Sequence, residues 1–198
     1  MGLHERVAAA AEGELPEWSR VGDARRAHIE RVADLMAAWA AGRALSESDQ
    51  ARWRAAAYLH DALREAPADE LRPLVPEDLR DLPAGALHGP ATAERLRAEG
   101  VADPSLLRAV AYHTLGHPEF DDLGRALYVA DILEPGRASL PAVREALRAR
   151  MPGELDAVAR EVAGVRIRHM VERGLPLRLE TVGFWNVLTA EPSRVGVP

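Results

Sequence analysis

Apolar residues recur with helical spacing along most of this chain, and Gly and Pro separate one such stretch from the next. The stretch from about Asp23 to Ala41 shows the pattern most clearly. Its apolar positions are Ile29, Val32, Leu35, Met36 and Trp39. Spacings of three and four residues place these side chains on one face of a helix. The alternating pattern typical of strands does not occur, so the sequence predicts an all-α fold.

Capping residues and helix breakers predict where the helices begin and end. Ser46 with Asp49 resembles a capping box, and Asp103 followed by Pro104 is a strong N-terminal signal. The predicted helices cover a short N-terminal segment, 3–12, and then 23–41, 46–63, 90–100, 103–115, 122–133, 140–150, 153–172 and 179–188. The Pro-rich, acidic stretch 67–90 is expected to form short helical turns. With 198 residues and no repeat or linker, the chain is expected to form a single helical-bundle domain over 1–198, with its core within about 16–188.

Composition excludes several classes of function. The chain has no cysteine, so any transition metal must be bound by imidazole and carboxylate groups. The net charge of −6 argues against a nucleic-acid partner. No apolar stretch approaches the ~20 residues of a membrane span, and the N-terminus lacks the pattern of a signal peptide. We therefore expect no membrane partner and a cytoplasmic location.

Two acidic residues lie inside apolar stretches. Asp61 follows the run 55–59 and His60, and Asp131 interrupts the run 127–133. A charged carboxylate is rarely buried unless it is paired or binds a metal. The alternative for Asp131 is an exposed position on the outer face of its helix, but it shares a stripe with Leu127. Both aspartates are therefore candidate metal ligands.

The chain contains seven histidines, and any one of them alone would be interpreted as a surface residue or a hydrogen-bonded core residue. The dipeptide His60-Asp61 is also common by chance. His4 and His169 match no motif and are expected at the surface. The other histidines gain weight from their order along the chain and from the residues that flank them.

His28, His60-Asp61 and Asp131 occur in the order H…HD…D, each on a predicted helix. This order resembles the HD superfamily of metal-dependent phosphohydrolases. Five segments resemble its YqeK-type branch more specifically, and they are residues 25–28, 59–61 (LHD), 87–90 (LHGP), 112–116 (YHTLG) and 130–137 (ADILEPGR). That branch consists of symmetrical bis(5′-nucleosyl)-tetraphosphatases, and the similarity covers roughly Pro16 to Leu188.

The resemblance implies a site with two divalent transition-metal ions. One ion would be held by His28, His60, Asp61 and Asp131, and the second by Asp61, His88 and His113. Asp61 would bridge the two ions. Ligands this rich in histidine suit Fe, Mn, Zn or Co better than Mg or Ca, and the resemblance implies iron.

Residues close to these ligands are candidates for binding phosphate. The candidate substrate contacts are Arg25, Arg64, His113, Thr114, Asp131 and Arg137. Arg25 lies one helical turn before His28, and Arg64 lies three residues after Asp61.

Two positions depart from the pattern of the family. Arg64 stands where many HD proteins have Lys, and because all 25 basic residues of this chain are Arg we interpret this as a compositional bias. His117 stands where relatives more often have Arg. We expect His117 at the edge of the pocket rather than as a seventh metal ligand.

The resemblance implies that the small-molecule nucleotide diadenosine tetraphosphate is cut symmetrically to two ADP. A metal-bridging hydroxide would attack an inner phosphorus, with Asp61 and Arg64 as the catalytic residues. The segment near Leu175 to Thr181 would help to hold the base. Three alternatives stay open: another HD phosphohydrolase that acts on nucleoside monophosphates or guanosine polyphosphates, a nucleotide-binding module without activity, and a helical domain whose histidines match by coincidence. The sequence is compatible with a homodimer.

Overall fold

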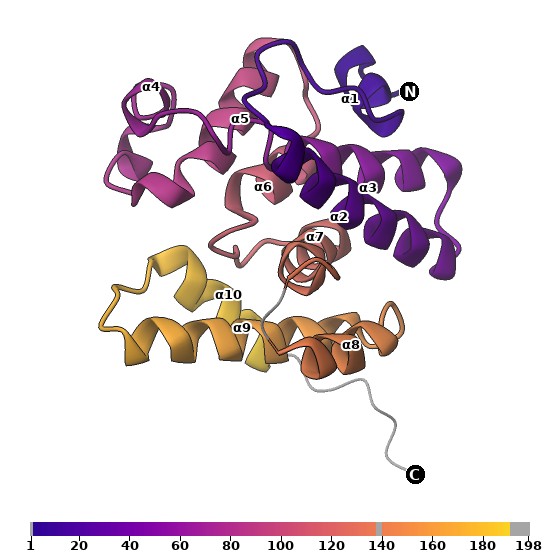
Figure 1. The fold of residues 1–198 in the computed structure, drawn as a ribbon, viewed down its shortest axis with the longest axis vertical. Coiled ribbons are helices and arrows are strands. Elements are labelled where there is room, and N and C mark those ends of the chain that lie inside the picture. Colours follow the sequence, from indigo (N-terminus) through magenta and orange to yellow (C-terminus); the bar gives the residue numbers. More distant parts are fainter. Residues whose placement is uncertain (1, 138–139, 191–198) are drawn as a thin grey trace.

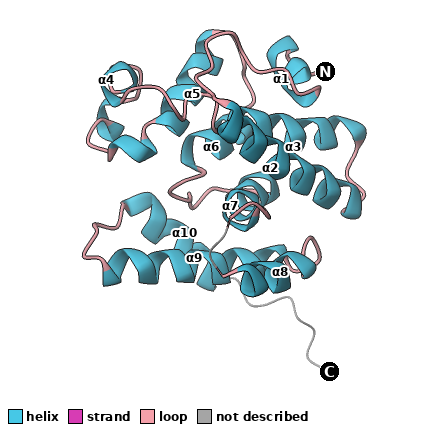
Figure 2. Cartoon of the chain, viewed as in Figure 1, coloured by secondary structure: helices cyan, strands magenta, loops and turns pink. Residues whose placement is uncertain are grey.

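The computed structural model describes residues 2–137 and 140–190, and within these ranges it contains helices and no strand (Figure 2). The α-helices are α1 Glu5–Ala11, α2 Asp23–Gly42, α3 Glu47–Leu59, α4 Ala68–Leu71, α5 His88–Ala98, α6 Pro104–Tyr112, α7 Asp122–Leu133, α8 Pro141–Ala149, α9 Leu155–Glu172 and α10 Leu179–Ala190. The 3₁₀ turns η1 Glu77–Leu79 and η2 Ala84–Ala86 lie between α4 and α5. The all-α prediction is confirmed. None of the described helices is both long enough and apolar enough to cross a membrane.

Side-chain caps set the start of several helices. Ser46 accepts a hydrogen bond from the backbone N–H of Asp49 (3.1 Å) before α3, as the capping-box pattern predicts. Asp103 accepts one from the N–H of Leu106 (3.0 Å) before α6. His4 corrects an expectation, because it is half-buried and its Nδ1 accepts a hydrogen bond from the N–H of Arg6 (3.1 Å) at the start of α1.

Helices α3 and α6 end earlier than the sequence predicts, at Leu59 and Tyr112. In each case a histidine ring binds the carbonyl that the next helical N–H would use. The Nδ1 of His60 lies 2.6 Å from the carbonyl oxygen of Ala57, and the Nδ1 of His113 lies 2.9 Å from that of Val110. Contrary to the expectation that they lie on helices, His60-Asp61 and His113 are therefore found in turns just beyond a helix end.

Helix α7 lies in the middle of the fold (Figure 1). It contacts α2, α3 and α6 on one side and α8 and α9 on the other. In Figure 1, α8, α9 and α10 form a layer below α7, and the N-terminal helices lie above it. The apolar core runs through both layers, and Tyr128 of α7 meets Phe184 of α10 with ring centroids 5.2 Å apart. A residue on α7 can thus face helices of either layer.

Two glycines of the matching motifs permit close contacts that position the site. A Cβ at Gly89 would lie 2.8 Å from the carbonyl oxygen of Val110, so α5 approaches α6 this closely only because residue 89 is glycine. Gly116 has a φ of +79°, and a Cβ there would overlap the Phe184 ring of α10. These contacts bring the start of α5 to the end of α6 and bring α10 against the following turn.

Candidate metal centre

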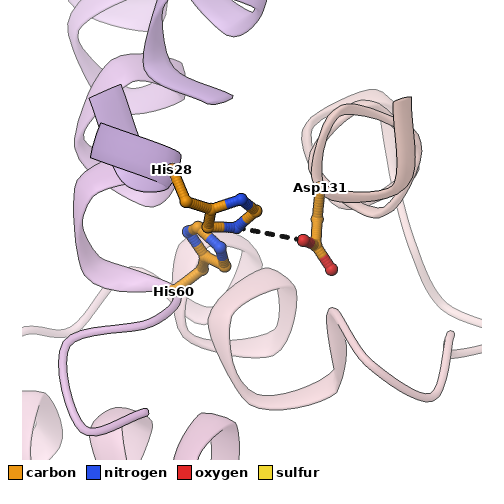
Figure 3. Close-up of side chains that lie close together, drawn as sticks. All are labelled: His28, His60 and Asp131. Atoms are coloured by element: carbon orange, nitrogen blue, oxygen red, sulfur yellow. Dashed lines mark ion pairs between the residues drawn. The ribbon is translucent and has the colours of Figure 1, made fainter. Parts of the chain in front are cut away.

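Six predicted ligands that are far apart in the sequence come together in space. They are His28 on α2, His60 and Asp61 after α3, His88 at the first position of α5, His113 after α6 and Asp131 on α7. Five of them are buried, and the side chain of Asp131 is 13% exposed. In Figure 3, the His28 and His60 rings face Asp131, which projects from α7 on the opposite side.

Asp61 lies between two groups of imidazoles. Its Oδ1 is 2.9 Å from the Nε2 of His88 and 3.6 Å from the Nε2 of His113. Its Oδ2 is 3.6 Å from the Nε2 of His28 and 3.5 Å from the Nε2 of His60. Each carboxylate oxygen therefore faces a different half of the cluster, which is the geometry that a bridging ligand needs.

Asp131 completes the half of the cluster that contains His28. Its Oδ1 is 3.2 Å from the Nε2 of His28, the contact drawn as a dashed line in Figure 3. His28, His60 and Asp131 can each offer an atom within 4.8 Å of the others, and so can His60, Asp61 and His113. His60 thus lies within reach of both halves of the cluster, whereas the resemblance implies that it binds only the metal ion of the His28 half.

Contacts with the outer ring nitrogens orient the imidazoles toward the cluster. The backbone carbonyls of Ala57 and Val110 hold the Nδ1 of His60 and His113, which turns each Nε2 inward. The Nδ1 of His28 is instead 3.3 Å from the Oε1 of Glu134. Glu134 is 2% exposed, and Arg31 donates to its other oxygen at 2.5 Å.

No role for Glu134 is predicted from the sequence, although this residue lies in the matching segment 130–137. The available signal is its position three residues after Asp131, which places both acids near one face of the chain as α7 ends. Burial raises the pKa of Glu134, but hydrogen bonds from Arg31 and from the N–H of Gly136 outweigh it and leave this pKa below its ordinary value. Glu134 is therefore an ionised partner for the Nδ1–H of His28.

The protonation states of the cluster suit metal binding. Burial lowers the pKa of His60 to about 4 and lowers the pKa of His88 as well. Burial acts the other way on Asp61, but interactions with His60, His113 and His88 hold the pKa of this carboxyl well below its usual range. The pKa of Asp131 is also lowered, because its contact with the His28 ring and the charge of Arg137 outweigh its burial. Neutral imidazoles and ionised carboxylates are the forms that bind metal ions.

Unpartnered buried nitrogens show that the cluster fits a metal ion. The Nε2 atoms of His28 and His60 are buried, and neither makes a hydrogen bond within the described residues. Burying such a group without a partner is unfavourable. Atoms bound to one ion at about 2.0–2.2 Å lie roughly 3–3.5 Å apart, and the distances around Asp61 and Asp131 are close to this range. The six residues thus present a donor set and a spacing that could hold divalent metal ions.

A cavity of about 440 Å³ opens beside the cluster. Its lining includes Asp61, His88, His113 and Asp131 together with the predicted phosphate contacts Arg25, Arg64, Thr114 and Arg137. Residues from the C-terminal layer complete the wall, and these include Arg166, Met170, Leu175, Pro176 and Arg178. The cavity is within the size range of small-molecule sites, about 300–1,000 Å³. The segment near 175–181 therefore contributes to the wall, and its role in holding the base stays a prediction.

The arginines of the cavity differ in their partners. Arg25 donates to the Oδ2 of Asp61 at 2.7 Å, and Arg137 donates to the backbone carbonyl of Asp131 at 2.8 Å and also to its carboxylate. Arg178 forms an ion pair with Asp81 at 2.7 Å. Arg64 and Arg166 are half-buried and have no ion pair with any described residue. The cavity is therefore lined by arginines that are paired with a carboxylate and by arginines that are not.

A larger and more open cavity of about 860 Å³ lies elsewhere, along α5 and α6. None of the six clustered residues lines it. His117 does line it, and the His117 ring packs against Tyr112 with centroids 4.5 Å apart. The expectation that His117 lies at the edge of the substrate pocket is therefore wrong, because this ring faces a different cavity. His169 is exposed, as expected.

Three relatives carry the same descriptive name, symmetrical bis(5′-nucleosyl)-tetraphosphatase. The protein from Halalkalibacterium halodurans is 28% identical, with 73% of this chain and 79% of that protein covered. The one from Staphylococcus aureus is 25% identical, with 96% of this chain and 97% of that protein covered. The one from Bacillus subtilis is 35% identical over 50% of this chain and 55% of that protein.

A solved structure supports the fold. It is a crystal structure from Clostridium acetobutylicum, described as a predicted HD superfamily hydrolase involved in NAD metabolism. It superposes with a TM-score of 0.73 at 22% identity and covers 96% of this chain and 99% of that chain. The arrangement of helices described above is therefore that of a known HD superfamily structure.

The HD domain family model matches residues 25–136. This range is more than half of the chain and includes all six residues of the cluster. The chain belongs to the HD domain family.

Proposed function

We propose that this protein hydrolyses diadenosine tetraphosphate at its central phosphate bridge and releases two ADP. The observation that carries the proposal is the position of Asp61, whose two oxygens face separate groups of imidazoles beside an arginine-lined cavity. The shared name of the three relatives supports this substrate and this symmetrical cut.

Two divalent metal ions would be held by the clustered side chains. His28, Asp131 and the Oδ2 of Asp61 would serve one position, His88, His113 and the Oδ1 of Asp61 the other, and His60 lies within reach of both. When bound, the ions would supply positive charge to phosphate oxygens and lower the pKa of a water molecule. A set of four imidazoles suits Fe, Mn, Zn or Co, and we propose iron.

The arginines of the cavity would bind and orient the polyphosphate. Arg25 and Arg137 are fixed by Asp61 and Asp131, and a guanidinium has five N–H donors, so each keeps donors for a phosphate oxygen. Arg64 has no ion pair with a described residue and lines the same cavity. It is therefore free to stabilise the negative charge that develops on the departing ADP.

Thr114 would provide a neutral hydrogen-bond donor to the polyphosphate. Its hydroxyl oxygen is buried, has no hydrogen-bond partner among the described residues, and belongs to a residue of the cavity wall. A buried hydroxyl without a partner is unfavourable, and a phosphate oxygen would satisfy it. Thr114 follows His113 directly, so the donor lies next to one of the proposed ligands.

Product analysis tests this proposal. Protein loaded anaerobically with Fe²⁺, or with Mn²⁺, is incubated with diadenosine tetraphosphate, and the nucleotides are separated by ion-exchange chromatography. We expect ADP as the sole product. AMP with ATP would contradict the symmetrical cut. Faster turnover of nucleoside monophosphates or guanosine polyphosphates in a parallel panel would favour a different phosphohydrolase activity, and turnover of none would favour a binding module.

A further inference from the structure

The wall of the cavity that faces away from the N-terminal helices is formed by α9 and by the segment that leads into α10. Arg166 and Met170 lie one helical turn apart on α9, and Leu175, Pro176 and Arg178 follow in that segment. None of these residues lies within the 25–136 range of the family match. This wall is therefore built from the C-terminal layer of helices, outside the range that the family model matches.

Arg166 is half-buried in this wall and has no ion pair with any described residue. Burying a cation away from water is unfavourable unless an anion compensates it. The neighbouring Arg178 shows the contrast, because Asp81 already neutralises it at 2.7 Å. Arg166, like Arg64, thus lacks a counter-ion in a cavity where Arg25, Arg137 and Arg178 are each paired with a carboxylate.

Arg64 and Arg166 lie beside opposite halves of the cluster. Leu63 and Leu87 belong to one small apolar cluster, which brings the turn that carries Arg64 next to His88. Arg166 lies on α9, which packs against α7, the helix that carries Asp131. Both arginines line the same cavity as these two ligands, so Arg166 approaches the cluster from the Asp131 side.

We propose that Arg64 and Arg166 form two anion subsites, one on each flank of the cluster, which bind the two ends of a polyphosphate that crosses it. The inference rests on the proposed function and deepens it, because it assigns a reason for a central cut. A ligand with nucleotides at both ends would engage both cations and place its middle at Asp61. Met170, Leu175 and Pro176 offer apolar contact to the nucleoside on the Arg166 flank.

The test measures affinity rather than turnover. Metal-loaded protein is titrated by calorimetry with diadenosine tetraphosphate whose central bridging oxygen is replaced by methylene, and separately with ADP. Arg166→Gln removes the charge of one flank. The matched control is Arg168→Gln, because Arg168 is an exposed arginine two residues further along α9 and does not line the cavity.

We expect Arg166→Gln to raise the Kd of the methylene analogue about 10- to 100-fold, the usual range for loss of a charge-assisted hydrogen bond. The Kd of ADP should stay close to that of the wild type, because ADP needs one flank and Arg64 still supplies it. Arg168→Gln should change neither value, and Arg166→Lys should recover part of the affinity for the analogue.

Two outcomes would overturn the inference. One is an unchanged Kd of the analogue in Arg166→Gln, and the other is an equal loss in Arg168→Gln, which would indicate a general effect of charge. Failure of the proposed function is distinguishable, because it would appear as AMP and ATP in the product analysis of the wild type, whatever the affinities of the variants.

Discussion

The two sides of the cavity are built in different ways. On the cluster side, buried side chains are fixed by named partners, as Asp61 is by Arg25 and His28 is by Glu134. On the side of α9 and α10, half-buried or exposed residues such as Arg166 and Leu175 line the wall, and Arg178 is tied to an exposed Asp81. The first side has the geometry for chemistry at phosphorus, and the second has the composition for binding the rest of a substrate.

This difference predicts how each side responds to substitution. A group buried among charges leaves uncompensated partners when it is removed, so changes in the cluster should have large effects. A half-exposed group can be replaced by water, so changes in the C-terminal wall should affect ligand affinity more than stability or chemistry.

Asp61→Asn should have the largest effect, because it removes the charge shared by both halves of the cluster. We expect kcat for diadenosine tetraphosphate to fall by roughly 10³-fold or more, the scale for loss of a principal charge-stabilising group. Bound metal, measured by plasma mass spectrometry, should fall as well. Asp34→Asn is the control, because Asp34 is exposed on α2. Full metal content and activity in Asp61→Asn would show that the two halves do not depend on this residue.

The metal-free protein should lose stability in mild acid. His60 has a folded-state pKa of about 4 against an ordinary value near 6.5, so protons bind the unfolded chain first as the pH falls. The free energy of unfolding should therefore drop between about pH 6.5 and pH 4, by about 3 kcal/mol from His60 alone. Urea titrations in EDTA between pH 7.5 and 4 measure this drop. His60→Asn should flatten the curve and His169→Asn should not, and a flat curve for the wild type would contradict the burial argument.

Glu134→Gln should weaken metal binding without removing a ligand. The amide keeps the shape of the side chain but loses the charge that faces the Nδ1 of His28, and changes of this kind typically cost 10- to 100-fold in metal affinity. Competition with a chromogenic chelator gives the dissociation constant. Glu30→Gln is the control, since Glu30 lies on α2 with its side chain 48% exposed. Equal affinities in the wild type and Glu134→Gln would mean that Glu134 does not position His28.

Asp81→Asn should have the smallest effect on stability. It breaks an ion pair with Arg178 whose acidic partner is 70% exposed, and exposed pairs contribute about 1 kcal/mol or less. Urea denaturation checks the stability, and KM for diadenosine tetraphosphate should rise slightly as the segment before α10 loses a contact. A loss of stability as large as that of a cluster variant would remove the contrast between the two sides.

The metal-binding cluster could be predicted from the sequence because some of its residues are charged side chains in otherwise apolar stretches. Asp61 and Asp131 are acidic residues within apolar stretches, and a buried carboxylate needs a charged partner or a metal ion. His28 and His113 approach these aspartates only through the tertiary fold, which the helical pattern of the sequence does not reveal. The family resemblance predicted that these residues come together. The helix ends beside His60 and His113 differ from the prediction because a ring nitrogen of each histidine contacts a backbone carbonyl. Whether it does so depends on the side-chain rotamer, which the sequence pattern does not indicate.

The other side of the cavity could not be predicted in the same way. Arg166 is one of 25 arginines, and nothing in its neighbourhood distinguishes it from a solvated helix residue. Its significance depends on how α9 packs against α7, which brings it to the Asp131 half of the cluster. Glu134 is an intermediate case, because its segment matches a motif but its role depends on which way the His28 ring points.

Anomalous diffraction from crystals of the Mn²⁺-loaded protein would show whether Asp61 bridges two metal positions. We expect two anomalous peaks per chain, one within bonding distance of each Asp61 oxygen, with His28 and Asp131 at one peak and His88 and His113 at the other. A single peak, or two peaks of which only one contacts Asp61, would contradict it.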